Sequence, residues 1–91
     1  MTESADLQQL GGRIKEFVMN EFLPGEDPNE LTPETALISG GILDSLATVK
    51  LIAFLEEEYG ISFESHEISA DYLDTLPDIA KLTGRKITES R

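Results

Sequence analysis

The sequence predicts an all-α fold: a small four-helix bundle of three main helices and one short helix, with a long first loop. Apolar residues recur at helical spacing in residues 4–23, 45–59 and 78–86, and proline or glycine separates these segments. Residues 51–55 are apolar without alternation, and the one stretch that alternates briefly, residues 61–63, has no second strand to pair with. Helices of this kind with short connections pack as a bundle.

The composition is that of one small globular domain. The 91 residues, 40% of them hydrophobic, suffice for a single core. We expect residues 1–91 to form one domain, with the core at residues 4–87 and a flexible C-terminal tail at residues 88–91. No apolar stretch approaches the length of a membrane span, and the N-terminus lacks the pattern of a secretion signal, so we expect a monomeric cytoplasmic protein.

The charge is strongly negative, with a formal net charge of −11 and a sequence pI near 4.2. This charge excludes nucleic acid as a partner, because a phosphate backbone would be repelled, and it favours brief, electrostatically steered contacts with a basic protein surface. The chain has no cysteine, so it forms no disulfide, and a thiol would have to come with a cofactor. No spacing of histidine and acidic residues predicts a metal site.

The first helix is expected over residues 4–23. Gly11 and Gly12 lie in its middle, where each costs about 1 kcal/mol relative to alanine. We expect one continuous helix with a weak first half, and the close approach of a neighbouring helix would explain the glycine pair. The apolar face of this helix is formed by Leu7, Leu10, Ile14, Phe17 and Phe22.

A long ordered loop is expected over residues 26–39, because three prolines between residues 24 and 33 exclude regular helix. Asp27 to Asn29 could begin a calcium loop, but Leu31 and Thr32 stand where that loop needs an oxygen ligand and a glycine, so calcium binding is excluded. Apolar residues should hold the loop against the bundle: Leu31, Ala36, Leu37 and Ile38.

The central helix is expected over residues 45–59. Gly40-Gly41 releases the backbone before it, and Asp44 and Ser45 stand at its start, where a side-chain oxygen can accept from free backbone N–H groups. The Ser45 hydroxyl would lie at the positive end of the helix dipole, which stabilises an attached phosphate. Gly60 suits the left-handed position at the end of the helix.

Two rows of side chains divide the central helix. One row is predicted to face the core: Thr48, Leu51, Ile52, Leu55 and Tyr59. The other row and its charged neighbours form a candidate docking surface for partner proteins: Leu46, Val49, Lys50, Ala53, Glu56 and Glu57. Burial in the core is the alternative for the apolar members of this second row. The acids of residues 56–58 lie where the helix dipole disfavours them, so we expect them to serve a purpose other than helix stability.

The last third of the chain predicts one short helix and one longer helix. The short helix is expected near residues 69–73 with Ser69 as its cap, and the longer helix at residues 78–86 with Thr75 as its cap. The inward residues of the longer helix are Ile79, Leu82 and Ile87. Three cations should lie near the C-terminal, negative end of its dipole, where positive charge is stabilising: Lys81, Arg85 and Lys86.

The centre of the chain resembles an acyl carrier protein. The resemblance covers roughly residues 7–87 and rests on Gly41-Ile42-Leu43-Asp44-Ser45-Leu46, Val49, Leu51 and Glu56-Glu57-Glu58-Tyr59-Gly60-Ile61. It implies that Ser45 bears 4′-phosphopantetheine, taken from coenzyme A by a separate phosphopantetheinyl transferase with magnesium, and that Asp44 takes part in transferase recognition. It also implies a carrier that is not an enzyme and that delivers acyl thioesters to transient partners such as acyl-loading ligases or synthases.

Departures from the family pattern leave other functions open. Many bacterial fatty-acid carriers have acids at the positions of Ala47 and Lys50, and residues 47–49 are closer to standalone carriers served by adenylating ligases, such as the D-alanyl carrier type. An aminoacyl or aryl carrier is therefore one alternative, and an unmodified acidic protein-interaction module is another. A serine hydrolase is excluded because Ser45 lacks the Gly-x-Ser-x-Gly turn, and His66 reads as a solvated surface residue.

Overall fold

Four α-helices and two 3-10 turns lie within residues 3–89, the part of the chain that the structure, a computed structural model, describes. In chain order they are α1 (Glu3–Phe22), η1 (Pro28–Glu30), α2 (Ser45–Tyr59), η2 (Ser65–Glu67), α3 (Ala70–Leu73) and α4 (Leu76–Glu89). These residues contain no strand, and the predicted all-α fold of three main helices and one short helix is confirmed.

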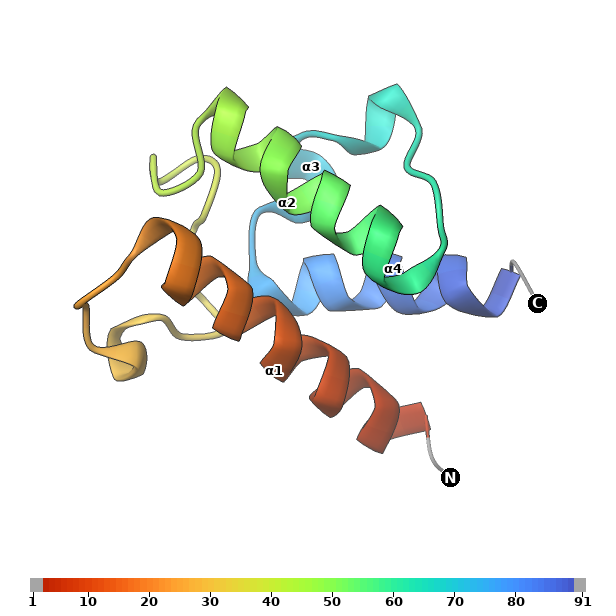
Figure 1. Cartoon of the computed structure of the whole chain (residues 1–91), viewed down its shortest axis with the longest axis horizontal. Coiled ribbons are helices and arrows are strands. Elements are labelled where there is room, and N and C mark those ends of the chain that lie inside the picture. The colour runs from red at the N-terminus through yellow and green to blue at the C-terminus, as the bar shows by residue number, and fades with distance from the viewer. Residues whose placement is uncertain (1–2, 90–91) are drawn as a thin grey trace.

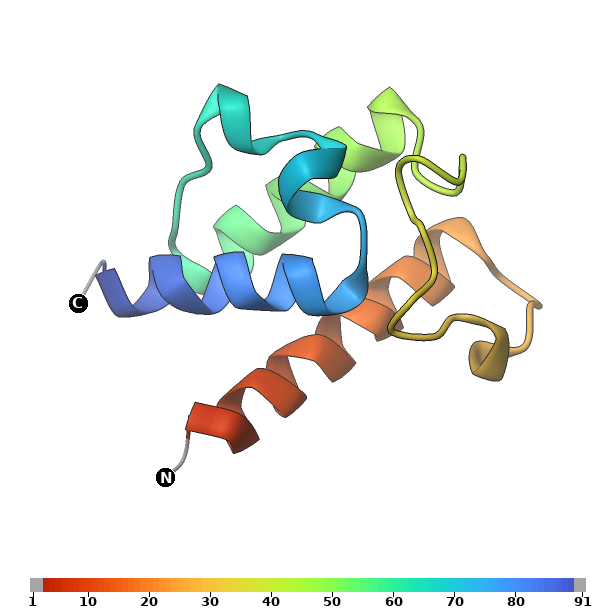
Figure 2. The same cartoon turned by 180° about the vertical axis from the view of Figure 1, so that it is seen from behind.

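The start of α2 lies at one end of the molecule. Helix α1 packs against both α4 and α2, and α3 packs against α4. Both views place the start of α2 away from the N-terminal end of α1 and from the C-terminal end of α4 (Figures 1 and 2). The long loop between α1 and α2 lies at the same end as the start of α2. The start of α2 is therefore set among loops and not between helices.

The core joins all four helices to the long loop. Of the row that the sequence predicts to face the core, four residues are buried and Tyr59 is half-buried. The loop contributes Leu31, Leu37 and Leu43. The helices contribute Leu10, Ile14, Val18, Leu51, Ile52, Leu55, Leu73, Leu76, Ile79 and Leu82.

The glycine pair in α1 does not mark a close contact. Helix α1 is continuous through Gly11 and Gly12, as predicted, but a Cβ added at either residue would meet nothing within 4 Å. The suggested reason for the pair is therefore wrong. The close approach lies at Gly84 of α4, where an added Cβ would lie 3.1 Å from Leu7 Cδ2 and 3.7 Å from Leu10 Cδ2. A side chain at Gly84 would require the Leu7 side chain to shift.

Helix α4 is longer than the sequence indicates. It begins at Leu76, where Thr75 Oγ1 accepts from the Asp78 N–H at 3.2 Å, as expected of a cap. It ends at Glu89, so Lys81 lies in its middle and the prediction that Lys81 stands at the negative end is wrong. Lys86 does lie in the last turn. Of the tail expected at residues 88–91, the first two residues are helical, and residues 90–91 lie outside the described part of the chain.

Helix α3 is short, as predicted, but its cap differs. Ser69 occupies the N-cap position of α3, yet its side chain makes no capping hydrogen bond. In the preceding turn η2, the Glu67 carboxylate accepts from the Glu64 N–H at 2.8 Å, and the Glu67 N–H donates to the Glu64 carbonyl at 3.0 Å. Ser69 contributes to α3 through its carbonyl, which accepts from the Leu73 N–H at 2.9 Å, and not through its hydroxyl.

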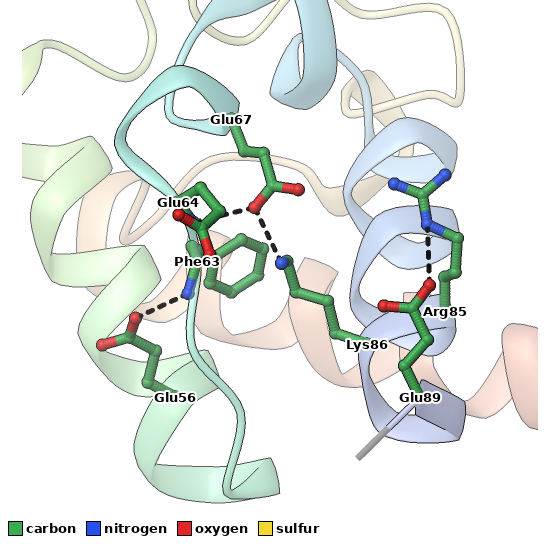
Figure 3. A network of polar contacts seen from close by, with 7 residues as sticks. All are labelled: Glu56, Phe63, Glu64, Glu67, Arg85, Lys86 and Glu89. Carbon is green, nitrogen blue, oxygen red and sulfur yellow. Dashed lines mark hydrogen bonds and ion pairs between the residues drawn. The ribbon is translucent and has the colours of Figure 1, made fainter.

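The acids at the end of α2 tie this helix to its neighbours, in line with the expectation that they do not serve helix stability. Glu58 accepts from Arg13 of α1 at 2.8 Å, and Glu56 accepts from the Phe63 N–H at 2.9 Å. Beside them, Glu67 of η2 pairs with Lys86 of α4 (Figure 3). The connection between α2 and α3 is therefore fastened both to α2 and to α4.

Candidate functional site

Ser45 is the first residue of α2 and is exposed. Asp44 takes the N-cap position with an extended backbone, and its Oδ1 accepts from the Ala47 N–H at 2.8 Å. The Asp44 carbonyl in turn accepts from the Thr48 hydroxyl at 2.8 Å. The start of α2 is thus capped by its neighbours, while the Ser45 hydroxyl has no hydrogen-bond partner among residues 3–89 and faces solvent.

The segment before Ser45 folds into a tight turn, residues 36–43, which we call the glycine turn. Gly41 has a φ of +86°, a left-handed conformation that favours glycine. Gly40 is needed for another reason, because a Cβ there would overlap the carbonyl oxygen of Ala36. The Gly41 N–H donates to Ile38 O at 3.1 Å, and the Leu43 N–H donates to Leu37 O at 2.8 Å. Both glycines therefore have a specific role in bringing the chain to Ser45.

Asp74, between α3 and α4, is distant from the glycine turn in sequence but holds it by hydrogen bonds. Its Oδ1 accepts from the backbone N–H groups of Ile38 and Ser39, each at 2.8 Å, and its Oδ2 accepts from the Ser39 hydroxyl at 2.7 Å. Its own carbonyl accepts from the Leu37 N–H at 2.6 Å. The hydrogen bond from the Ser39 hydroxyl, followed by those from the two backbone N–H groups, lowers the pKa of Asp74 below its ordinary value.

Sequence reasoning missed Asp74. Its partners lie 35 and 36 residues earlier in the chain for the side-chain contacts, so no local pattern links them. The only nearby signal was Thr75, which marks the start of the next helix and says nothing of Asp74.

The candidate docking residues lie along α2 behind Ser45. Leu46 is 65% exposed and Val49 is 58% exposed, and the other exposed members are Lys50, Ala53 and Glu57. Glu56 is only half-buried, and its carboxylate is occupied by the Phe63 N–H. The apolar members of this row are therefore not part of the core.

The remaining titratable residues offer no catalytic arrangement around Ser45. His66 is exposed and contacts the Tyr72 ring, with centroids 5.8 Å apart. Within the described residues, no histidine, lysine or acid donates to or accepts from the Ser45 hydroxyl. Across residues 3–89, no group of histidine, cysteine and acidic residues is placed to hold a metal ion, and no helix is long and apolar enough to cross a membrane.

The geometry suits the attachment of a phosphate-linked group. The hydroxyl is accessible, and becoming a phosphodiester would break no hydrogen bond within the described residues. The positive end of a 15-residue helix stabilises the negative charge that a phosphate brings. Room for a long arm exists because the neighbouring residues from Ser39 to Gly41 and Leu46 are also exposed.

Two comparisons with known proteins agree with this geometry. A family model described as a phosphopantetheine attachment site matches residues 23–83, which include the glycine turn, Ser45 and α2. An acyl carrier protein from Thermosynechococcus vestitus (strain NIES-2133 / IAM M-273 / BP-1) is 34% identical over 75 residues, covering 82% of this chain and 88% of the relative. Neither match favours an aminoacyl carrier or an unmodified interaction module. The chain belongs to the phosphopantetheine-attachment family of acyl carrier proteins, whose members carry 4′-phosphopantetheine as their prosthetic group.

Proposed function

We propose that Ser45 is the residue that bears the 4′-phosphopantetheine group. The observation that carries this proposal is an exposed serine hydroxyl, without a partner among the described residues, at the first position of a helix capped by Asp44. The dipole of α2 favours the phosphate there, and the cap leaves the hydroxyl free to react.

In the proposed reaction, the Ser45 oxygen attacks the pyrophosphate of coenzyme A on a separate phosphopantetheinyl transferase. A serine phosphodiester forms, the nucleotide half of coenzyme A leaves, and the serine proton passes to a base of the transferase. Asp44 is exposed and holds the helix start through Oδ1, so its second carboxylate oxygen can serve the transferase and its magnesium ion. Once attached, the arm supplies the thiol that this cysteine-free chain lacks.

The exposed row on α2 is proposed as the docking face for the enzymes that load and use the acyl group. Leu46 and Val49 lie one and four positions after Ser45, so an enzyme that reaches the arm must pass over them. Lys50 is the only charged residue of α2 before Glu56, in a chain of net charge −11. We expect partner surfaces there to be apolar with an acid near Lys50, and Glu57 to meet a basic residue at the rim. Glu56 contributes indirectly by holding Phe63.

The carrier itself contributes no catalytic group in this proposal. It raises the local concentration of the acyl group at each acyl-loading ligase or synthase that it visits, through brief contacts. Because loading draws on coenzyme A, we place the function in the cytoplasm. Because one chain carries one proposed attachment serine, Ser45, a monomer suffices.

Intact-mass measurement tests the assignment of Ser45. The protein is incubated with coenzyme A, magnesium and a broad-specificity transferase, alongside a Ser45→Ala variant and a Ser62→Ala control, which removes another exposed serine. We expect one phosphopantetheine group on the wild type and on the control, and none on Ser45→Ala. Modification that persists in Ser45→Ala, or a wild type that stays unmodified, would overturn the proposal.

A further inference from the structure

We propose that Asp74 is a positioning residue for the modification of Ser45: it holds the glycine turn in the conformation that the transferase recognises beside the serine. This inference rests on the assignment of Ser45 proposed above. It concerns a residue 29 positions from Ser45 that belongs neither to α2 nor to its docking row.

Asp74 is a fixed anchor. It stands directly between α3 and α4, and the side chains on either side of this junction, Leu73 and Leu76, are 0% and 8% exposed. Two buried leucines therefore fix the backbone of Asp74, while its carboxylate points to the glycine turn and accepts three hydrogen bonds from Ile38 and Ser39. A carboxylate that accepts from three donors is a strong and directional contact.

Asp74 is the sole polar link of the glycine turn to the rest of the described chain. Within residues 3–89, every hydrogen bond between residues 36–43 and a residue outside them ends on Asp74. The other hydrogen bonds of the turn are internal, from Gly41 to Ile38 and from Leu43 to Leu37. Burial of Leu37 and Leu43 holds the turn on the molecule, and Asp74 fixes how its polar edge is oriented.

The effect of Asp74 reaches Ser45 by a short route. The Leu37 N–H donates to the Asp74 carbonyl, and Leu37 O accepts from the Leu43 N–H, so these two hydrogen bonds connect Asp74 to Leu43. Leu43 is 2% exposed and is followed directly by Asp44 and Ser45. The outer edge of the turn, from Ser39 to Gly41, is exposed next to this end of α2. An enzyme that closes on Ser45 therefore contacts a surface whose shape Asp74 sets.

Steady-state kinetics of phosphopantetheinylation separate positioning from chemistry. For Asp74→Ala we expect KM for the carrier to rise about tenfold, the size typical for loss of a hydrogen-bonded charge, with kcat nearly unchanged because Ser45 and Asp44 remain. Asp74→Asn keeps an oxygen at Oδ1 for the Ile38 and Ser39 N–H groups, so it should restore most of the wild-type KM. Ser39→Ala removes only the Oδ2 contact and should raise KM by less than Asp74→Ala does.

Two controls exclude simpler causes. Asp71→Ala removes an equal charge three residues earlier, within α3, at a residue with no hydrogen bond or ion pair among the described contacts, and should leave KM unchanged. Leu10→Ala weakens the core where α1 packs against Gly84 of α4, and should also leave KM unchanged while the protein is folded. Hydrogen exchange should show faster exchange at the N–H groups of residues 37–39 in Asp74→Ala, with the amides of α2 as slow as in the wild type.

The outcomes distinguish this inference from the proposed function. A wild type that is not modified at Ser45 overturns both. A wild type that is modified, with Asp74→Ala showing the same KM as Asp71→Ala, overturns the role of Asp74 and leaves the assignment of Ser45 intact. If Asp74→Ala does not fold, the Ser39→Ala variant decides: an unchanged KM there overturns the inference, and a raised KM supports it.

Discussion

The ammonium group of Lys86 lies 2.7 Å from the carboxylate of Glu67, in a pair whose side chains are only 13% and 9% exposed. The same ammonium group sits 5.4 Å from the centre of the Phe63 ring, so one cation joins α4 both to η2 and to the segment that leaves α2 (Figure 3). Lys86 and Glu56 thus both fasten the connection between α2 and α3, which contains no strand and little helix.

Replacement of Lys86 by methionine should lower the free energy of unfolding by about 1.5–3 kcal/mol, because Glu67 would keep its charge in a nearly buried position without its cation. Chemical denaturation measures this loss. The matched control is Arg85→Met, which breaks an exposed pair with Glu89 whose atoms are 3.9 Å apart, and which should cost less than about 1 kcal/mol. Equal losses in the two variants would contradict a special role for the Lys86 pair.

The same pair predicts a dependence of stability on pH. The hydrogen bond from Lys86, and then that from the Glu64 N–H, lower the pKa of Glu67 below its ordinary value. A lowered pKa in the folded state contributes stability above the ordinary glutamate pKa of about 4.3, and this contribution is lost as pH falls through the folded-state pKa. The difference in unfolding free energy between wild type and Lys86→Met should therefore be constant near neutral pH and shrink in acid. A difference that stays constant down to the acid transition would contradict this.

Thr83 of α4 should be a site where a substitution stabilises the protein. Its side chain is 0% exposed, and its hydroxyl has no hydrogen-bond partner within residues 3–89. Valine has nearly the same shape without the unpaired hydroxyl, so Thr83→Val should raise the free energy of unfolding by about 1 kcal/mol. The control is Thr48→Val: this hydroxyl is also buried but donates to Asp44 O at 2.8 Å, so its loss should cost about 1 kcal/mol. A loss of stability in both variants would show that the Thr83 hydroxyl is satisfied in solution.

Local signals explain why the central helix could be predicted closely. Asp44 caps α2 and Gly60 ends it with a φ of +67°, and both act on backbone groups within four residues of themselves. The spacing of apolar residues in α2 likewise separated the buried row from the exposed row, because burial on a helix follows its own period. Signals of this kind need no knowledge of what lies across the fold.

The contacts that the sequence could not predict depend on the tertiary fold, and several of them join distant residues. Asp74 meets Ser39 across 35 residues, and Lys86 meets Glu67 from another helix. The need for glycine at position 40 follows from the Ala36 carbonyl, whose place depends on the fold of the whole turn. Gly84 was not singled out either, since only the crossing of α1 over α4 gives it a reason. Tertiary packing, and not local preference, decides each of these.

The last prediction separates the core of α2 from its docking face. Leu51 and Leu55 are 0% exposed, so truncation of either to alanine should leave a cavity and cost about 2–5 kcal/mol. Leu46 and Val49 lie on the exposed row of the same helix, so Leu46→Ala and Val49→Ala should cost well under 1 kcal/mol, the usual range for exposed positions. The measurements are chemical denaturation and the rate of phosphopantetheinylation for each variant.

The two rows should give opposite patterns in these measurements. The core variants should lose stability but keep their modification rate where they remain folded, because the Ser45 end of α2 is unchanged. The surface variants should keep stability but be modified more slowly, because the transferase must lie over Leu46 and Val49 to reach Ser45. Lys50→Glu should likewise leave stability nearly unchanged while altering which partners are accepted, since it reverses the only charge between Ser45 and Glu56. If Val49→Ala destabilises the protein as much as Leu55→Ala does, that row is part of the core in solution and the docking face must lie elsewhere.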